Sequence, residues 1–209
     1  PIAGNGGEAT LVLDGIFAEI CSDVTLIPDC GPSVPAINIT QASSTEIWAT
    51  FDLTTTPVGS YTIEANFPGE SSSLTDAIEI VEGNGPALSV LNNLPNYGRP
   101  NRKTTGLLDV TNVGDNNAKS PLIAVSSASG SLILGRLGRN GRQLEISANS
   151  FVYLAAPQEG PADKIRPLQS AFIRYSVQPT VDFDEIVVQE LEEITTPVDW
   201  SQFRDPFRP

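Results

Sequence analysis

The stretch from residue 107 to residue 121, LLDVTNVGDNNAKSP, constrains the fold of this chain most strongly. A strand-like run ends at Asn112, a polar glycine turn follows, and Pro121 opens the next apolar run. Short apolar runs that alternate with turns are typical of antiparallel β-structure. The 17 glycines and 17 prolines among 209 residues fit many short strands joined by tight turns. We therefore predict an all-β protein that is built from antiparallel β-sandwiches.

Alternation of apolar and polar residues locates further strands on both sides of this stretch. Proline and glycine between residues 57 and 61 predict a corner, and EGNGP at 82–86 predicts a linker. The alternation predicts strands at 8–14, 24–28, 34–39, 46–53, 77–81 and 170–177, further short strands within 120–154, and an extended or mixed segment at 181–196.

The charge is distributed unevenly along the chain. Residues 1–86 carry 12 acidic and no basic groups (−12), and residues 87–209 carry 13 acidic and 12 basic groups (−1), which gives the total of −13. Together with the length, this asymmetry predicts two domains, at 1–84 and 86–194, followed by a tail at 195–209. Phosphates would be repelled by the first half, so nucleic acid is not an expected partner.

Two basic or aromatic segments stand out as candidate interaction surfaces. The first is a predicted hairpin tip with Arg136, Arg139 and Arg142, and the alternative for it is an ordinary solvated tip. The second is the proline-bounded tail, whose aromatic and arginine side chains are of the types enriched at interface hot spots. We expect the tip or the tail to contact the acidic first domain of a neighbouring copy. The tail residues concerned are Trp200, Phe203, Arg204, Phe207 and Arg208.

The two cysteines, Cys21 and Cys30, bear on the cellular compartment. A disulfide that closes this short loop is the preferred interpretation and indicates an oxidising environment; two free thiols are the alternative. The chain contains no histidine and no other cysteine, which argues against a zinc site. Asn38 begins the sequon Asn-Ile-Thr, so a glycan there is plausible if the host glycosylates.

No residue pattern indicates catalysis or a cofactor. Histidine-based catalysis is impossible within this chain, and no carboxylate pair is singled out by its spacing. The side-chain oxygens of Asp115, Asn116 and Asn117 suggest calcium, but a plain polar turn is the more common outcome. The glycine-rich run at 4–7 lacks the strand-then-helix setting of a phosphate loop and is expected to be a flexible entry. We predict no enzyme activity, no cofactor and no metal.

The first half resembles the immunoglobulin-like early-set or TIG modules of surface proteins. The matching segments are GEATLVL at 7–13, ATFDL at 49–53 and PVGSYTI at 57–63. The second half resembles adhesin-type repeat modules with a T-N-x-G-D signature, seen at 111–115. IRPLQ at 165–169 stands where such modules usually have Pro-Gly before a late strand. The resemblance implies tandem immunoglobulin-like sandwiches in an extracellular or cell-surface setting.

These observations predict a non-enzymatic structural or adhesive segment of an extracellular protein. Copies or neighbouring modules are expected to stack head to tail, steered by charge. The alternative is a carbohydrate-binding module that uses an exposed aromatic such as Trp48 or Trp200. No apolar run is long enough to span a membrane. The chain has no methionine and begins with Pro1, so we expect a processed chain or a piece of a longer one.

Overall fold

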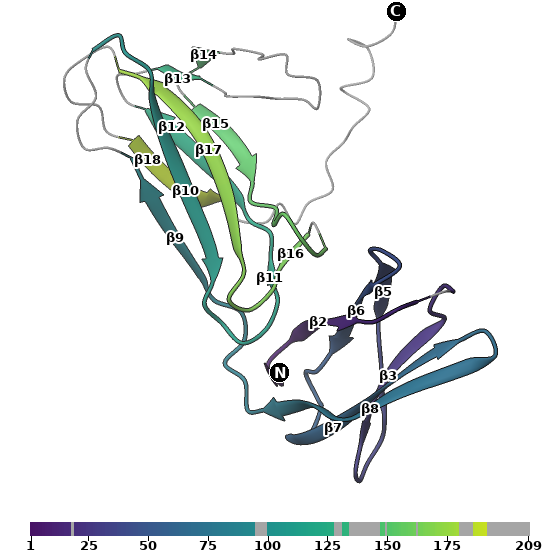
Figure 1. The fold of residues 1–209 in the computed structure, drawn as a ribbon. Coiled ribbons are helices and arrows are strands. Elements are labelled where there is room, and N and C mark those ends of the chain that lie inside the picture. Colours follow the sequence, from purple (N-terminus) through teal and green to yellow (C-terminus); the bar gives the residue numbers. More distant parts are fainter. Residues whose placement is uncertain are drawn as a thin grey trace, which may run out of the picture.

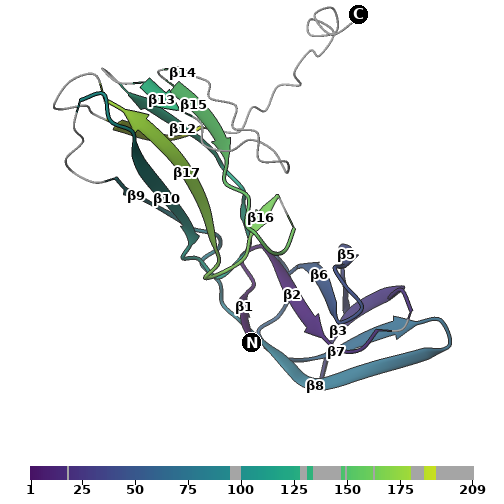
Figure 2. The same ribbon diagram turned by 45° about the horizontal axis from the view of Figure 1, so that its top comes forward.

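The regular structure of this chain consists of β-strands only, in the part that the computed structural model describes: residues 1–17, 19–94, 100–127, 131–133, 147–148, 150–161, 163–179 and 186–191. The all-β prediction is therefore confirmed. Figures 1 and 2 show two groups of strands, β1–β8 and β9–β18, that meet at one end; we call them the N-terminal and the C-terminal half. No helix suited to crossing a membrane occurs among the described residues.

The N-terminal half contains two sheets. The five-stranded sheet has the order β1-β8-β7-β3-β4 and the three-stranded sheet the order β2-β6-β5. β1 pairs with the end of β8 in parallel, and the other pairings are antiparallel. The strands are β1 (Ile2–Gly4), β2 (Glu8–Asp14), β3 (Asp23–Pro28), β4 (Val34–Pro35), β5 (Asn38–Gln41), β6 (Glu46–Asp52), β7 (Gly59–Phe67) and β8 (Glu70–Val81).

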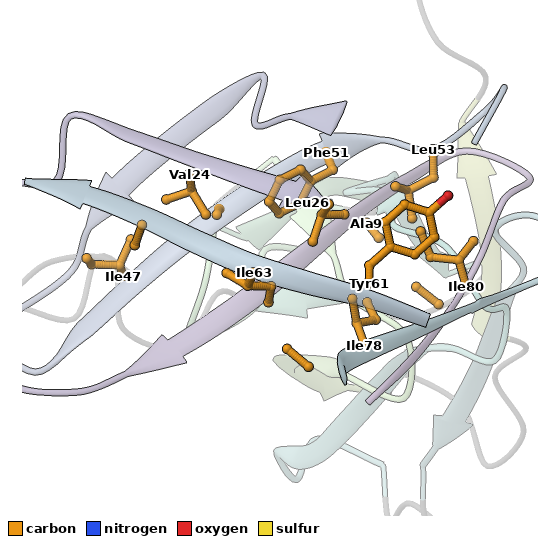
Figure 3. Packing of buried hydrophobic residues seen from close by; sticks show 14 of the residues in the cluster. Ala9, Val24, Leu26, Ile47, Phe51, Leu53, Tyr61, Ile63, Ile78 and Ile80 are labelled. Carbon is orange, nitrogen blue, oxygen red and sulfur yellow. The ribbon is translucent and has the colours of Figure 1, made fainter. Parts of the chain in front are cut away.

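Both sheets of the N-terminal half contribute to one hydrophobic core (Figure 3). On β6, Ile47, Ala49 and Phe51 are all fully buried, as the alternation of the sequence predicts. They share one buried cluster with Leu26 of β3 and Ile78 of β8 from the five-stranded sheet. The period-two pattern therefore correctly identified the buried face of β6.

The C-terminal half has its own core and three sheets, with the orders β14-β13-β17-β10-β9, β15-β12-β18 and β11-β16. The central pair is β10 and β17, in which Leu108 lies opposite Ile173 and Val110 opposite Ala171. The strands are β9 (Leu88–Asn93), β10 (Thr104–Asn112), β11 (Ala118–Lys119), β12 (Leu122–Ser127), β13 (Ser131–Ile133), β14 (Ser147–Ala148), β15 (Ser150–Leu154), β16 (Lys164–Ile165), β17 (Ser170–Gln178) and β18 (Ile186–Leu191).

Two expected strands differ from the observed ones. The strand expected at 34–39 is two strands, because the chain leaves the five-stranded sheet after β4 and enters the three-stranded sheet at β5. β8 begins at Glu70, seven residues before the expected start at 77. The sequence does not indicate this first part, because its side chains are exposed and all but Leu74 are polar. Backbone pairing with β7 forms this part of β8, and a hydrophobic pattern cannot reveal it.

The predicted corner at 57–61 is present. Tyr61 is 2% exposed, and its hydroxyl donates a hydrogen bond of 2.8 Å to the backbone oxygen of Pro57. Such a bond fixes the path of the chain between two strands while the ring fills the core. Proline, glycine and tyrosine at this spacing thus have a structural role.

The predicted disulfide between Cys21 and Cys30 is not present. Cys21 is buried and its thiol contacts the backbone oxygens of Asp23 and Asn66, whereas Cys30 is exposed and free. The six-residue strand β3 separates the two cysteines and spans about 20 Å when extended. A disulfide requires Cα atoms within about 7 Å of each other. The sequence separation is short, but the intervening residues form a strand rather than a turn.

The phenol of Tyr153 on β15 makes the stability of the C-terminal half sensitive to alkaline pH. Burial, with a smaller contribution from Tyr175, raises the pKa of Tyr153 to about 12 from 10.0. As pH rises, the phenol therefore loses its proton in the unfolded chain before it does so in the folded protein. The contribution of the protonated phenol to the unfolding free energy is complete below pH 10 and is lost as pH rises toward 12. We expect Tyr153→Phe to flatten the fall in unfolding free energy over this range, measured by urea denaturation at stepped pH. Equal pH dependence in the wild type and the variant would contradict this assignment.

Candidate functional site: the junction between the two halves

The polar turn between β10 and β11 forms the contact between the two halves. Its residues 113–117 lie against β1, the start of β2 and the linker at 82–87. Asn112, the last residue of β10, positions this turn. Its side-chain NH₂ donates to the backbone oxygens of Asn116 at 2.7 Å and Ile165 at 2.8 Å.

The amide oxygen of Asn112 completes the arrangement. It accepts from the backbone NH of Gly114 at 3.0 Å and of Ala87 at 3.4 Å. Asn112 has no exposed surface, so each of these bonds replaces a contact with water. The asparagine of the T-N-x-G-D signature thus connects the turn, the linker and β16.

Asp115 holds the linker through its carboxylate. The two carboxylate oxygens accept hydrogen bonds from the backbone NH groups of Asn84 at 2.8 Å and Gly85 at 2.9 Å. The backbone of Asp115 adds two bonds, since its NH donates to Gly85 and its oxygen accepts from Gly4, both at 3.2 Å. Hydrogen bonds to a charged acceptor are stronger than neutral ones, so Asp115 fixes the linker backbone.

Asn116 and Asn117 connect the turn to the N-terminal half. The side chain of Asn116 is fully buried and donates to the backbone oxygen of Gly4 at 2.7 Å. Asn117 pairs with β2: its backbone NH donates to Glu8 O at 2.7 Å, and its side chain exchanges hydrogen bonds with the Thr10 backbone NH and hydroxyl. Thr10 is only 7% exposed, so these hydrogen bonds are shielded from water.

An ion pair closes the same contact from the C-terminal half. Lys164 of β16 pairs with Glu8 at the start of β2, and both side chains are partly exposed. A pair of this kind adds little stability by itself, because water screens it. It does place a basic group of the C-terminal half against the acidic N-terminal half.

Glycines allow the backbones at this junction to approach closely. A Cβ on Gly114 would lie 2.4 Å from the oxygen of Gly85 and 2.5 Å from the nitrogen of Ala87. A Cβ on Gly83 would lie 2.7 Å from the Cα of Gly4. The glycine-rich run at 4–7, expected to be a flexible entry, is therefore packed between the linker and the turn.

The hydrogen bonds of the turn also bear on the calcium hypothesis. The carboxylate oxygens of Asp115 and the amide oxygen of Asn117 accept hydrogen bonds from backbone NH groups. This is the arrangement expected of a plain polar turn, the alternative to calcium binding. The amide oxygen of Asn116 is buried without a partner among the described residues. No group of three acidic, cysteine or histidine side chains in the described ranges is placed to hold a metal ion.

A groove of about 770 Å³ lies beside the junction. It is lined by β2 of the three-stranded sheet and, from the five-stranded sheet, by β1, β8 and part of β7. The turn at residues 166–169 of the C-terminal half reaches its rim. Its lining includes apolar residues of β2 and β7, among them Leu11, Leu13, Ile63, Ala65 and Phe67.

Leu168, at the rim of this groove, has an unusual backbone conformation. Its φ is 62°, in the left-handed region that favours glycine, and its side chain is 85% exposed. The backbone NH of Gln169 donates to Arg166 O at 3.0 Å across Pro167 and Leu168, as in a type II turn. The turn is therefore the one expected of a Pro-Gly sequence, although the chain has leucine in the glycine position.

Replacing Leu168 with glycine should stabilise the protein. A left-handed non-glycine residue costs about 1–2 kcal/mol, and the exposed side chain contributes little burial, so we expect Leu168→Gly to gain ~1 kcal/mol. Chemical denaturation measures the change. Leu168→Ala is the matched control, because alanine keeps a Cβ in the same backbone conformation. A gain of the same size in both variants would show that side-chain exposure, not backbone strain, is responsible.

Of the other predicted site residues, Asn38 is exposed at the start of β5, so its sequon is accessible. Trp48 is partly buried on β6, and its indole NH donates to Glu46. The remaining predicted interaction residues lie outside the described residues: Arg136, Arg139, Arg142, Trp200, Phe203, Arg204, Phe207 and Arg208. The interaction roles of all of these stay predictions.

Sequence reasoning identified the polar turn but not its partners. Glu8, Thr10 and Lys164 belong to the junction, yet nothing in their local sequence distinguishes them from ordinary strand residues. The usable signal was the coincidence of the glycine-rich segments GNGG at 4–7 and GNG at 83–85 with Gly114 and the Asp-Asn-Asn run that follows it. Glycine permits a close approach of two backbones as well as flexibility, so the glycines alone did not identify a junction.

Comparisons with known proteins do not assign a family. No protein-family model matches the sequence, and the comparison with curated proteins found no match. One similar solved structure is a protein of unknown function from Porphyromonas gingivalis W83, with 15% identity, 85% of this chain and 78% of that chain covered, and a TM-score of 0.24. A likeness this distant carries no argument about function.

Proposed function

We propose that this chain is a non-enzymatic structural segment of an extracellular or cell-surface protein. In this proposal two immunoglobulin-like β-sandwiches, at 1–84 and 86–194, act as one rigid spacer that associates with copies or neighbouring modules. The observation that carries it is the junction, where the side chains of Asn116 and Asn117 bond to the N-terminal half and those of Asn112 and Asp115 bond to the linker.

The interpretation as sandwiches has support from the N-terminal half. Its two sheets share one core, and Tyr61 makes the hydrogen bond to Pro57 that is typical of the tyrosine corner in immunoglobulin-like domains. That bond lies within the segment that resembles TIG modules.

Rigidity distinguishes a spacer from two domains on a loose tether. Domains in one chain usually move relative to each other unless their interface is extensive. Here the backbone of the linker at 82–87 is itself hydrogen-bonded by Asp115 and Asn112, so bending the linker breaks these bonds. A spacer of fixed shape sets the distance and orientation between the modules on either side of it, which suits a structural role.

Small-angle X-ray scattering over a series of concentrations and salt levels tests the proposal. At infinite dilution the wild type should give one compact, fixed particle, and the double variant Asp115→Ala, Asn117→Ala a larger radius of gyration. The intensity should rise with concentration at low salt, because the −12 N-terminal half attracts the basic groups of another copy. A wild type as extended as the variant would overturn the rigid spacer, and no concentration dependence at low salt would overturn self-association.

A further inference from the structure

We propose that the groove beside the junction accepts an extended peptide strand from a neighbouring polypeptide. The strand would add to the free edges of β2 and β8 and place small aliphatic side chains between the two sheets. This inference rests on the proposed structural role, since it names the surface by which one segment would hold the next.

The walls of the groove offer unpaired strand edges. Among the described residues β2 pairs only with β6, and on its other side Asn117 bonds to Glu8 and Thr10. In an antiparallel strand every second residue directs its NH and C=O to the same side. Beyond Asn117, Val12 and Asp14 therefore turn backbone groups toward the groove, which they line.

On the other side of the groove, the edge of β8 already pairs with one added strand, β1. β1 adds to β8 in parallel, but it covers only Glu79 to Val81. In the described part of the chain, the preceding stretch of β8 pairs with β7 alone, and its residues 70–76 are exposed. An exposed strand edge of this length is a template for a further strand.

The interior of the groove is apolar and fits alternating side chains. Leu11, Leu13 and Phe67 are only partly buried although they pack against the core. Phe67 also stacks on Phe17, with ring centroids 5.7 Å apart. A strand that inserts every second side chain would complete the burial of these residues, which is the driving force for its binding.

Three exposed apolar side chains from separate segments surround the groove. Ile2 is 67% exposed, Leu74 65% and Leu168 85%, and all three line it. Leu168 is also the residue with the strained backbone. At 85% exposure the Leu168 side chain contributes little to folding, and backbone strain of this kind concentrates at ligand-binding positions.

Charge indicates the chemistry of the occupant. Asp14, Glu159 and Arg166 line the groove, and the N-terminal half around it carries no basic residue. A peptide with lysine or arginine beside its apolar stretch is therefore favoured over an acidic one. The partner is an extended, basic-flanked strand with alternating small aliphatic residues.

A synthetic peptide tests this binding. The probe is an eight-residue peptide in which valine alternates with threonine and a lysine stands at each end, labelled for fluorescence anisotropy. We expect saturable binding to the full chain and an affinity about tenfold weaker for Leu74→Glu. The matched control is Leu91→Glu on β9, since Leu91 is 57% exposed but does not line the groove. Circular dichroism checks that both variants fold.

Hydrogen exchange of the same complex locates the peptide. Protection of backbone NH groups in Val12, Asp14 and residues 72–76 of β8 supports strand addition. No binding by the wild type, equal loss in both variants, or protection confined to other strands would overturn the proposal. These outcomes are separate from the scattering experiment, because a rigid chain can lack an acceptor groove and a flexible chain can have one.

Discussion

Replacing Asn112 with alanine should destabilise the protein by about 4 kcal/mol. The substitution removes a side chain that is fully buried and makes four hydrogen bonds, to Asn116, Ile165, Gly114 and Ala87. The bonds to the backbone oxygens of Asn116 and Ile165 are buried, and leaving a buried backbone group without its partner costs about 1–3 kcal/mol. The change is measured by urea denaturation followed by circular dichroism.

Asn93→Ala is the matched control for this substitution. Asn93 lies on β9, opposite Leu107 of β10, and is exposed. An exposed strand residue of this kind is expected to change the unfolding free energy by less than ~0.5 kcal/mol. If Asn112→Ala were as stable as Asn93→Ala, the hydrogen bonds of the T-N-x-G-D turn would not hold the junction.

Gly114→Ala should be the second most damaging change, with a loss of about 2–3 kcal/mol. The new Cβ would lie 2.4 Å from Gly85 O and 2.5 Å from Ala87 N, both backbone atoms that cannot move as a side chain does. The turn and the linker must separate, and this weakens the bonds that Asp115 makes to Asn84 and Gly85. Denaturation and scattering should therefore report the same variant as less stable and more extended.

Gly7→Ala provides the control, because Gly7 lies in the same junction with room for a methyl group. Its Cβ would meet the nearest atom, the Cβ of Asn116, at 3.6 Å, an ordinary contact. We expect its stability to stay within ~0.5 kcal/mol of the wild type. Equal effects of the two substitutions would mean that the close approach at Gly114 is relieved without cost.

The strands were predictable where the sequence alternates between a buried and an exposed face. β6 shows this, since Ile47, Ala49 and Phe51 are buried while Asp52 is exposed. β2 follows the pattern only in part, because Ala9 is buried but Leu11 and Leu13 on the same face are partly buried. The first part of β8 breaks it: from Glu70 to Asp76 no side chain is buried, so only the backbone reveals the strand. This part of β8 is held by backbone pairing with β7, and such pairing leaves no pattern of buried side chains in the sequence.

The junction was only half predictable for a related reason. Asp115, Asn116 and Asn117 were correctly placed in a turn, because asparagine, aspartate and glycine favour turns whatever surrounds them. Their partners Gly4, Glu8 and Thr10 lie more than a hundred residues earlier in the chain. The sequence suggested calcium because it shows side-chain oxygens but not their partners. Oxygens that could bind a cation can equally accept hydrogen bonds from backbone NH groups, as those of Asp115 and Asn117 do.

Leu168 shows what a departure from a sequence pattern can mean. The resemblance to adhesin-type repeats was incomplete at IRPLQ, where Leu168 follows Pro167 in place of the usual glycine. The backbone there nevertheless adopts the glycine-like conformation, with φ of 62°. The hydrogen bonds of Leu168 NH to Asn112 O and of Gln169 NH to Arg166 O hold the turn against this strain.

The most direct test of the central claim is a distance distribution between the two halves, measured by double electron–electron resonance. One spin label is attached to Cys30, which is exposed and free, and the other to an Asn93→Cys substitution; Cys21 is buried and should not react. A rigid junction predicts one narrow distance peak, which broadens in the double variant Asp115→Ala, Asn117→Ala. A broad distribution in the wild type, unchanged by that variant, would contradict the claim that the turn after β10 joins the two halves into one unit.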